Sequence, residues 1–371
     1  MKAQLLLCLT LIGLTLSAQE IAPKQFLPSY GPVVQDGVDA SLEVSYIYWR
    51  VSEDGLISSS QGYNLTNKSS FNVIEPQGEQ QGIFDRCSSG FKAGFGADFK
   101  YDDWFIDVLY TYFHSNYNPL KNHQENGETL ESQGPYFTTI PGYFDTKSPL
   151  VVKPQPLFFN NMAAQALSFW NLRFNVIDSM LNKSFYLSRY LIVTPALGIK
   201  TTWQNQSYTA RYWIEGLSSK NQTTLENYRT FNKQFYAGVG TRLGLDTAWF
   251  VSDELSLFAQ IFGTTLFGVF KDKREDITAV AVKDTGEVLV ENNMKVNVRA
   301  VEHFVNTVLE TQIGLRWDYY LFEEAYRLRL QFGYENQLWF NQNHFLTPNL
   351  GGAQGADLGF MGFNFTVKFD F

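Results

Sequence analysis

Four histidines are the side chains of this sequence best suited to acid–base chemistry near neutral pH. They are His114, His123, His303 and His344, and none is spaced from a cysteine or a carboxylate as metal ligands usually are. No serine lies in the G-x-S-x-G turn that exposes the nucleophile of many hydrolases. The residues therefore predict a protein that is not an enzyme and has no cofactor or metal. A hydrolase that uses His114 or His303 is the alternative.

Charged residues of both signs recur at alternate positions of segments that otherwise favour β-strands. If these segments enclose a water-filled interior, opposite charges on facing walls set a transverse field and select small polar solutes. The other possibility is that they form neutralising salt bridges and close the interior. The candidate interior residues are Asp107, Arg173, Arg242, Glu310, Arg316, Arg329 and Glu335.

Period-two alternation is the main structural signal, because it is typical of strands with one apolar and one polar face. Between Phe91 and Tyr101 every odd position is apolar, whereas the even positions are glycine, lysine or aspartate. We expect the apolar faces to meet lipid. The same alternation predicts further strands at 41–48, 104–112, 170–176, 191–200, 235–246, 255–264, 305–318, 327–335 and 361–371.

These segments are longer than the strands of soluble proteins and fit a tilted membrane-spanning strand. Aromatic residues, 16% of the chain, gather at strand ends, as interfacial girdles do. Short connections near 102–103, 178–186, 249–254 and 319–326 alternate with long ones at 52–87, 115–165, 204–232, 271–303 and 341–356. The pattern predicts an all-β fold, a transmembrane antiparallel up-and-down β-barrel with short periplasmic turns and long outer loops. We expect ten strands, or up to twelve if 208–213 and 277–291 add more.

The first residues indicate export. Lys2 precedes an apolar run from Leu5 to Leu16 and a small-residue exit, which predicts a signal peptide at 1–18. We expect a periplasmic N-terminal segment at 19–39 and the barrel at 40–371. Cys87 would then be the only cysteine of the mature chain, a buried or loop thiol without an internal disulfide. The net charge of −8 argues against nucleic acid as a partner.

The chain ends on Phe371 within an alternating aromatic strand. Such an end is a docking strand for the barrel-assembly machinery, so we interpret Phe371 as an assembly signal. The other expected partners are outer-membrane lipid, lipopolysaccharide and small polar solutes.

Several strand motifs are familiar. They are Trp170-Asn171-Leu172-Arg173, Pro195-Ala196-Leu197-Gly198, Gly314-Leu315-Arg316-Trp317, Trp339-Phe340-Asn341-Gln342 and the terminal stretch 359–371. In these the chain resembles the Legionella-type major outer membrane protein family, which also occurs in chlamydia-related bacteria. The likeness covers the sequence well from about residue 166 onward and the first 150 residues loosely.

The resemblance implies a pore-forming barrel of the outer membrane. With the alternating charges, it favours a porin-like protein that lets small hydrophilic solutes or ions diffuse passively. The alternative is a closed surface barrel with a structural or adhesive role and no conducting pore.

Overall fold

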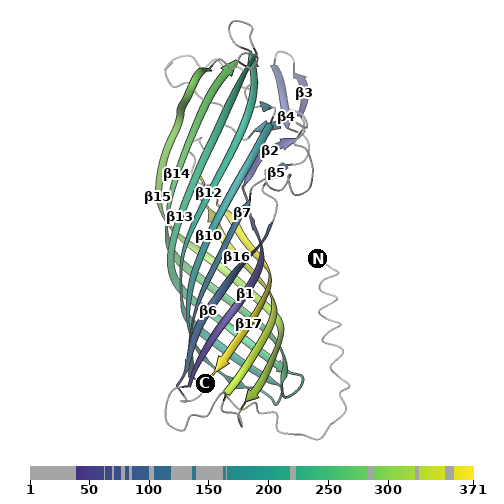
Figure 1. The fold of residues 1–371 in the computed structure, drawn as a ribbon, viewed down its shortest axis with the longest axis vertical. Coiled ribbons are helices and arrows are strands. Elements are labelled where there is room, and N and C mark those ends of the chain that lie inside the picture. The colour runs from purple at the N-terminus through teal and green to yellow at the C-terminus, as the bar shows by residue number, and fades with distance from the viewer. Residues whose placement is uncertain are drawn as a thin grey trace.

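The structure is a computed structural model that describes residues 39–61, 63–68, 71–76, 80–82, 86–99, 104–117, 136–138, 162–163, 165–217, 223–282, 288–321, 326–346 and 355–371. The described strands form a tall closed barrel (Figure 1). No helix in these ranges is long and apolar enough to cross a membrane. The expected signal peptide and nearly all of the expected N-terminal segment lie outside the described residues.

Ten antiparallel strands make the barrel wall. They are β1 (Asp39–Glu53), β6 (Arg86–Asp98), β7 (Trp104–Tyr117), β10 (Gln165–Lys183), β12 (Leu191–Leu217), β13 (Thr223–Phe250), β14 (Leu255–Val282), β15 (Val288–Leu321), β16 (Tyr326–Asn343) and β17 (Ala356–Asp370). Each pairs with the preceding and following strand of this series, and β1 also pairs with β17. The first and last strands thus close the ring and leave no free edge within it. The barrel of about ten strands predicted from the alternation is confirmed.

Nine of the ten strands turn the expected face outward. Their outward apolar side chains form a belt around the lower half of the barrel, which includes Val44, Phe95, Leu243, Ile261, Ile313, Phe332 and Phe365. On β14, for example, the belt runs from Leu257 to Phe267 on odd positions, while the even positions face the lumen. Such a belt is the lipid-facing surface of a barrel in a bilayer.

Strand β10 is the exception. Trp170, Leu172, Phe174 and Val176 were expected to face lipid, but they are buried in the lumen. Alternation reveals that the two faces of a strand differ without revealing which face points inward. The expectation was wrong because the part of the lumen beside these residues is itself apolar, so the apolar face of β10 lies inside there.

Two segments expected as long outer loops are mostly strand. The stretch 204–232 completes β12 and begins β13, and 271–303 completes β14 and begins β15. Their many charges suggest loops, but antiparallel pairing continues through them, as between Asn232 of β13 and Arg274 of β14. The segments 208–213, 277–282 and 288–291 therefore lengthen existing strands, and β12–β15 extend to the upper end of the barrel (Figure 1).

Short elements and two turns complete the described chain. β2 (Ile57–Gln61), β5 (Gln80–Gly82), β8 (Tyr136–Thr138) and β9 (Met162–Ala163) form one small sheet, while β3 (Tyr63–Lys68) and β4 (Phe71–Pro76) form a hairpin. At the lower end, β11 (Phe185–Tyr186) pairs with β12 within one of the turns. Cys87 is exposed on strand β6, so the expectation of a buried or loop thiol was wrong.

Two glycines on adjacent strands give a matched test of the packing. A Cβ on Gly240 of β13 would lie 1.8 Å from the backbone oxygen of Thr265, whereas a Cβ on Gly263 of β14 would meet nothing within 4 Å. We predict that Gly240→Ala lowers the free energy of unfolding by about 1–3 kcal/mol, because backbone atoms must move. Gly263→Ala should leave it nearly unchanged. Equilibrium denaturation in detergent micelles measures both, and equal effects would contradict this packing.

The barrel lumen as candidate functional site

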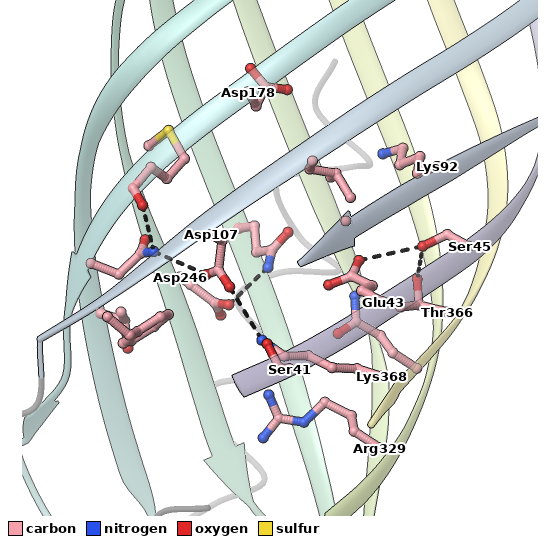
Figure 2. Close-up of a pocket in the computed structure, with 18 of the residues that line it drawn as sticks. Ser41, Glu43, Ser45, Lys92, Asp107, Asp178, Asp246, Arg329, Thr366 and Lys368 are labelled. Atoms are coloured by element: carbon pink, nitrogen blue, oxygen red, sulfur yellow. Dashed lines mark hydrogen bonds and ion pairs between the residues drawn. The ribbon is translucent and has the colours of Figure 1, made fainter. Parts of the chain in front are cut away.

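The lower lumen holds a chamber of about 310 Å³, lined by charged and hydrogen-bonding side chains together with apolar ones such as Val176, Met180 and Phe262. Its walls are the inward positions of the barrel strands at the end where the C-terminus lies (Figure 1). Ser45 and Thr366, on the paired strands β1 and β17, join their hydroxyls at 2.7 Å across this wall (Figure 2). The chamber is therefore lined by hydrogen-bonding groups while the same strands present apolar side chains to the outside.

Four charges from four strands meet near the top of the chamber. Lys200 Nζ lies 2.7 Å from Glu310 Oε1 and 3.0 Å from Asp178 Oδ1, and Arg242 NH1 donates to the same Glu310 oxygen at 2.6 Å. All four residues are buried. A buried carboxylate between two cations is stabilised by their attraction, which offsets the loss of hydration.

Five further ion pairs lie in the chamber wall. Four join Lys92 to Glu335 at 2.7 Å, Arg316 to Asp246 at 3.1 Å, Arg329 to Asp318 at 2.6 Å and Lys368 to Asp107 at 3.4 Å. Arg327 likewise pairs with Asp370. Each lysine and arginine that lines the described chamber therefore has a carboxylate partner. This is the arrangement of neutralising salt bridges given above as the alternative to a water-filled, selective interior.

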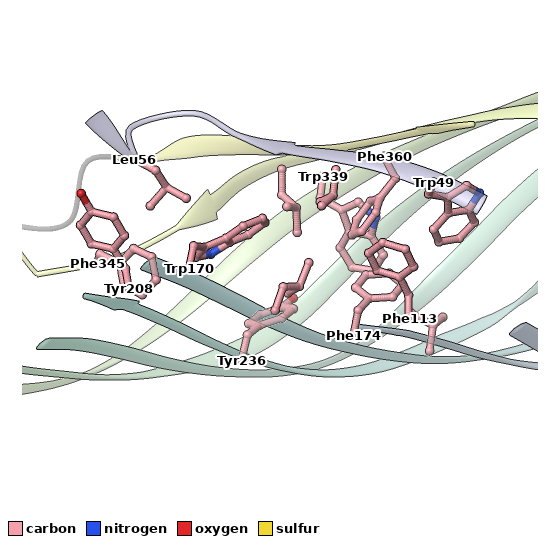
Figure 3. Close-up of a cluster of buried hydrophobic side chains, with 14 of the residues drawn as sticks. Trp49, Leu56, Phe113, Trp170, Phe174, Tyr208, Tyr236, Trp339, Phe345 and Phe360 are labelled. Atoms are coloured by element: carbon pink, nitrogen blue, oxygen red, sulfur yellow. The ribbon is translucent and has the colours of Figure 1, made fainter. Parts of the chain in front are cut away.

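Above the chamber the lumen is filled by an apolar cluster (Figure 3). Its aromatic centre includes Trp49, Phe113, Phe174, Trp339 and Phe360. The rings of Phe174 and Phe360 lie 4.6 Å apart, and those of Phe174 and Trp339 lie 5.2 Å apart. The cluster continues through Tyr236, Leu266, Phe270 and Val308 on β13, β14 and β15. Because it joins strands from both sides of the ring, it spans the lumen.

The segment after β16 adds a second layer within the upper lumen. Asn341 has a positive φ of 50°, and β16 loses regular pairing with β17 between Trp339 and Asn343. The chain beyond this point contacts the interior of the opposite wall. Gln342 Nε2 donates to Gln204 on β12 at 3.1 Å, and the His344 backbone N–H donates to Gln234 on β13 at 2.7 Å. Residues 341–346, called here the inner segment, thus cross the lumen.

Asp272 faces the lumen from β14 just above the apolar belt, near this segment. Its side chain is buried, and neither carboxylate oxygen has a hydrogen-bond partner among the described residues. Burial, followed by the nearby charge of Glu302, raises the pKa of Asp272 to about 8. The folded state therefore holds the proton of Asp272 more tightly than an unfolded chain does.

Six of the seven interior residues proposed from the sequence face the chamber. They are Asp107, Arg242, Glu310, Arg316, Arg329 and Glu335. Arg173 does not: it is exposed on the outer surface, opposite His114 of β7. Its placement in the lumen was wrong for the same reason as the face of β10.

Several ion-pair partners of these six residues were not predicted from the sequence. Among them are Lys200, Asp178, Asp246 and Asp318. The signal was present for Lys200, Asp246 and Asp318, since each occupies a polar position of an alternating segment. Asp178 instead follows the apolar positions of β10 and was expected in a short connection. What was missing is the register between strands. It places Lys200 opposite Gly240, two residues from Arg242, and such close neighbours on one face of a sheet interact.

The histidines do not gather into one site. His114 lies on the outer face, where Asn171 Nδ2 is 2.9 Å from its Nε2 atom, and His303 is exposed on the outer face of β15. His344 belongs to the inner segment and stacks on Phe270, with ring centroids 3.9 Å apart. His123 lies outside the described residues. No group of three or more His, Cys, Asp or Glu residues that could hold a metal occurs in the described ranges.

Phe371 follows the last strand directly. Its backbone N–H donates to the carbonyl of Ala40 at 2.9 Å, and its ring is partly exposed in line with Phe369. Recognition of this end by an assembly machinery remains a prediction.

Glu310 offers a test of the ion cluster. We predict that Glu310→Gln lowers the free energy of unfolding by about 3–5 kcal/mol, because Lys200 and Arg242 are then left with Asp178 alone. The control is Asp253→Asn, which removes an exposed carboxylate from the turn between β13 and β14 and should change stability little. Denaturant titration of the folded barrel measures both. A Glu310→Gln protein as stable as wild type would show that the cluster is not buried.

Asp272 predicts a pH dependence. Its folded pKa lies above the value near 4 of an unfolded chain, so the folded state holds the proton more tightly and its stability falls as pH rises from about 4 to about 8. The melting temperature should be lower at pH 9 than at pH 5, and Asp272→Asn should reduce that difference. An equal difference in the variant and in wild type would contradict the burial of an unpaired carboxyl group.

Comparison with known proteins found distantly similar solved structures and one matching family. No curated protein matches the sequence. Among solved structures, the chain is similar to the outer membrane protease OmpT from Escherichia coli, with a TM-score of 0.32, 10% identity, and coverage of 91% of this chain and 96% of that one. It is also similar to Ail of Yersinia pestis, with a TM-score of 0.25, 10% identity, and coverage of 90% and 99%.

The family match covers far more of the sequence than the motifs quoted above. It extends over residues 33–371, which includes every described strand of the barrel wall. The belt, the closed ring and this match locate the protein in the outer membrane. The chain belongs to the family of the Legionella pneumophila major outer membrane protein precursor.

Proposed function

We propose that this protein is a non-enzymatic surface barrel of the outer membrane whose lumen is sealed against passive diffusion, with a structural or adhesive role. The single observation that carries the proposal is the apolar cluster across the upper lumen. The five aromatic side chains at its centre project from the barrel strands themselves, so that no loop movement alone removes them. Opening a water-filled path through it requires exposing several buried aromatic rings, each at a cost of about 1.5–3 kcal/mol.

Barrel width supports the same conclusion. About eight strands enclose a lumen that side chains just fill, and two more strands widen it only slightly. Here bulky residues occupy the upper lumen, and the inner segment fills part of what remains. Salt bridges between facing walls further tie the lower lumen together, as with Lys92 on β6 and Glu335 on β16.

Porin-like diffusion of small hydrophilic solutes is the second candidate. The chamber of about 310 Å³, with charged and hydrogen-bonding side chains in its walls, favours it, as does the pore-forming role that the family resemblance implies. On this account the apolar cluster and the inner segment would form the narrowest part of a solute path.

The non-enzymatic part of the proposal is supported by where the histidines lie. His114 and His303 were the candidates for a hydrolase, yet they lie on different strands of the outer face, away from the chamber. The geometry offers them no shared substrate site.

Conductance of the refolded protein in a planar lipid bilayer distinguishes the two candidates. We predict that wild type gives no discrete channel openings, because the cluster seals the lumen. The triple variant Trp49→Ala, Trp339→Ala, Phe360→Ala should conduct, since it removes three rings from the cluster.

The matched control replaces neighbouring outward aromatics, Tyr48→Ala, Tyr334→Ala and Phe363→Ala, and should stay silent. A shift in gel mobility between unheated and heated samples checks that each variant folds. Regular channel openings of wild type would overturn the sealed barrel and support passive diffusion.

A further inference from the structure

On the outer face of β12–β15, the strand register aligns the outward side chains in rows across the four strands. These strands lie side by side in the wall (Figure 1). Their register places Ser207, Lys233, Lys273 and Arg299 in one row across the four strands. Lys271 lies on the same face two residues below Lys273, which is about 7 Å nearer the apolar belt. Four cationic side chains therefore occupy two adjacent rows just above the belt.

The row places like charges directly opposite one another. Lys233 pairs with Lys273, and Lys273 pairs with Arg299. Such cross-strand pairs destabilise a sheet unless an anion lies between them. Among described outward side chains of β12–β15 above the belt, Glu275 is the only acid. Its pKa is lowered by a hydrogen bond from Lys273 first, and by the charges of Lys233 and Arg299.

An apolar groove of about 640 Å³ lies directly beneath these cations. The row below Lys271 consists of Trp203, Ala237, Val269 and His303, and the next consists of Thr201, Val239, Phe267 and Val305. The small side chain of Ala237 lies between Trp203 and Val269. Phe267 is 63% exposed and Val239 is 51% exposed, as expected for side chains that meet acyl chains.

We propose that this surface binds a phosphorylated glycolipid of the outer leaflet, a lipopolysaccharide. The row of Lys233, Lys273 and Arg299, with Lys271, binds its phosphate groups, and the groove below accepts an acyl chain. This site lies on the outside of the barrel and is independent of whether the lumen conducts.

The arrangement favours this occupant over other anions. Free phosphate would use the cations but not the groove beneath them. Phosphatidylglycerol brings a single phosphate, whereas Lys233 and Arg299 lie two strand spacings apart, about 10 Å, which suits a headgroup with two phosphates. Above the row, Arg211 and Arg229 form a further like-charge pair that can meet anionic sugars.

The test uses full-length mature protein, refolded in detergent so that it carries no native lipid, with binding measured by native mass spectrometry. The probes are diphosphoryl lipid A, the same lipid without phosphates, and dioleoylphosphatidylglycerol. We expect wild type to bind diphosphoryl lipid A at least about tenfold more tightly than the triple variant Lys233→Gln, Lys273→Gln, Arg299→Gln.

Two controls separate the site from general charge and folding effects. Arg50→Gln, Arg173→Gln, Arg189→Gln removes the same number of exposed cations elsewhere and should bind like wild type. Ala237→Trp fills the groove and should weaken binding, whereas Ala259→Trp on the same outer face should not.

Equal binding of diphosphoryl lipid A by the triple variant and wild type would overturn the proposal. So would equal binding of the dephosphorylated lipid or of phosphatidylglycerol by wild type, because either result shows attraction without recognition of the phosphates.

Discussion

Satisfying the backbone hydrogen bonds in lipid is the constraint on which this structure depends. Hydrocarbon offers no partner for an N–H or a carbonyl group, so a sheet that crosses it must have no free edge. The chain meets this requirement by pairing β1 with β17 over thirteen residues of register, from Ser41 to Glu53. All other features of the barrel wall follow from a ring closed in this way.

In a closed barrel the outward and the inward face of each strand meet different physical requirements. The outward face must be apolar at the level of lipid, as in the belt that includes Val44, Leu243 and Ile313. The inward face has to fill a narrow space, and it does so with two chemistries. Paired charges occupy the lower lumen, and aromatic side chains occupy the upper lumen. Lys200 and Trp339 meet at the boundary, with the ammonium 5.6 Å from the ring centroid, so the two layers are joined by a cation–π contact.

The sequence alone predicted the ring, the strand number and the outward face of nine strands, because period-two alternation is a direct consequence of the lipid boundary. The prediction failed for the parts of the wall whose faces are not set by contact with lipid. In β10 the apolar face of the upper part points into the lumen. Arg173, on the opposite face, was therefore wrongly predicted to lie in the lumen. In 204–232 and 271–303 the wall stands above the belt, both faces carry polar residues, and charged strands resemble loops.

Partners across the lumen could not be predicted either. Glu310 and Arg242 were recognised as inward residues, yet their contact depends on how strands separated in sequence are aligned. Alternation contains no information about that register. The apolar cluster was missed for a related reason, since its members come from positions such as Ile47 and Phe113 that lie beyond the polar part of each inward face.

The closed ring is tested most directly by joining its first and last strands. Val44 on β1 lies opposite Val367 on β17, and both side chains face outward. In a Cys87→Ser background, Val44→Cys with Val367→Cys should form an intramolecular cross-link with a short bifunctional reagent in the folded protein. Val44→Cys with Leu330→Cys, one strand further away, should form far less. A folded barrel in which the first pair gives no intramolecular product would contradict closure between β1 and β17.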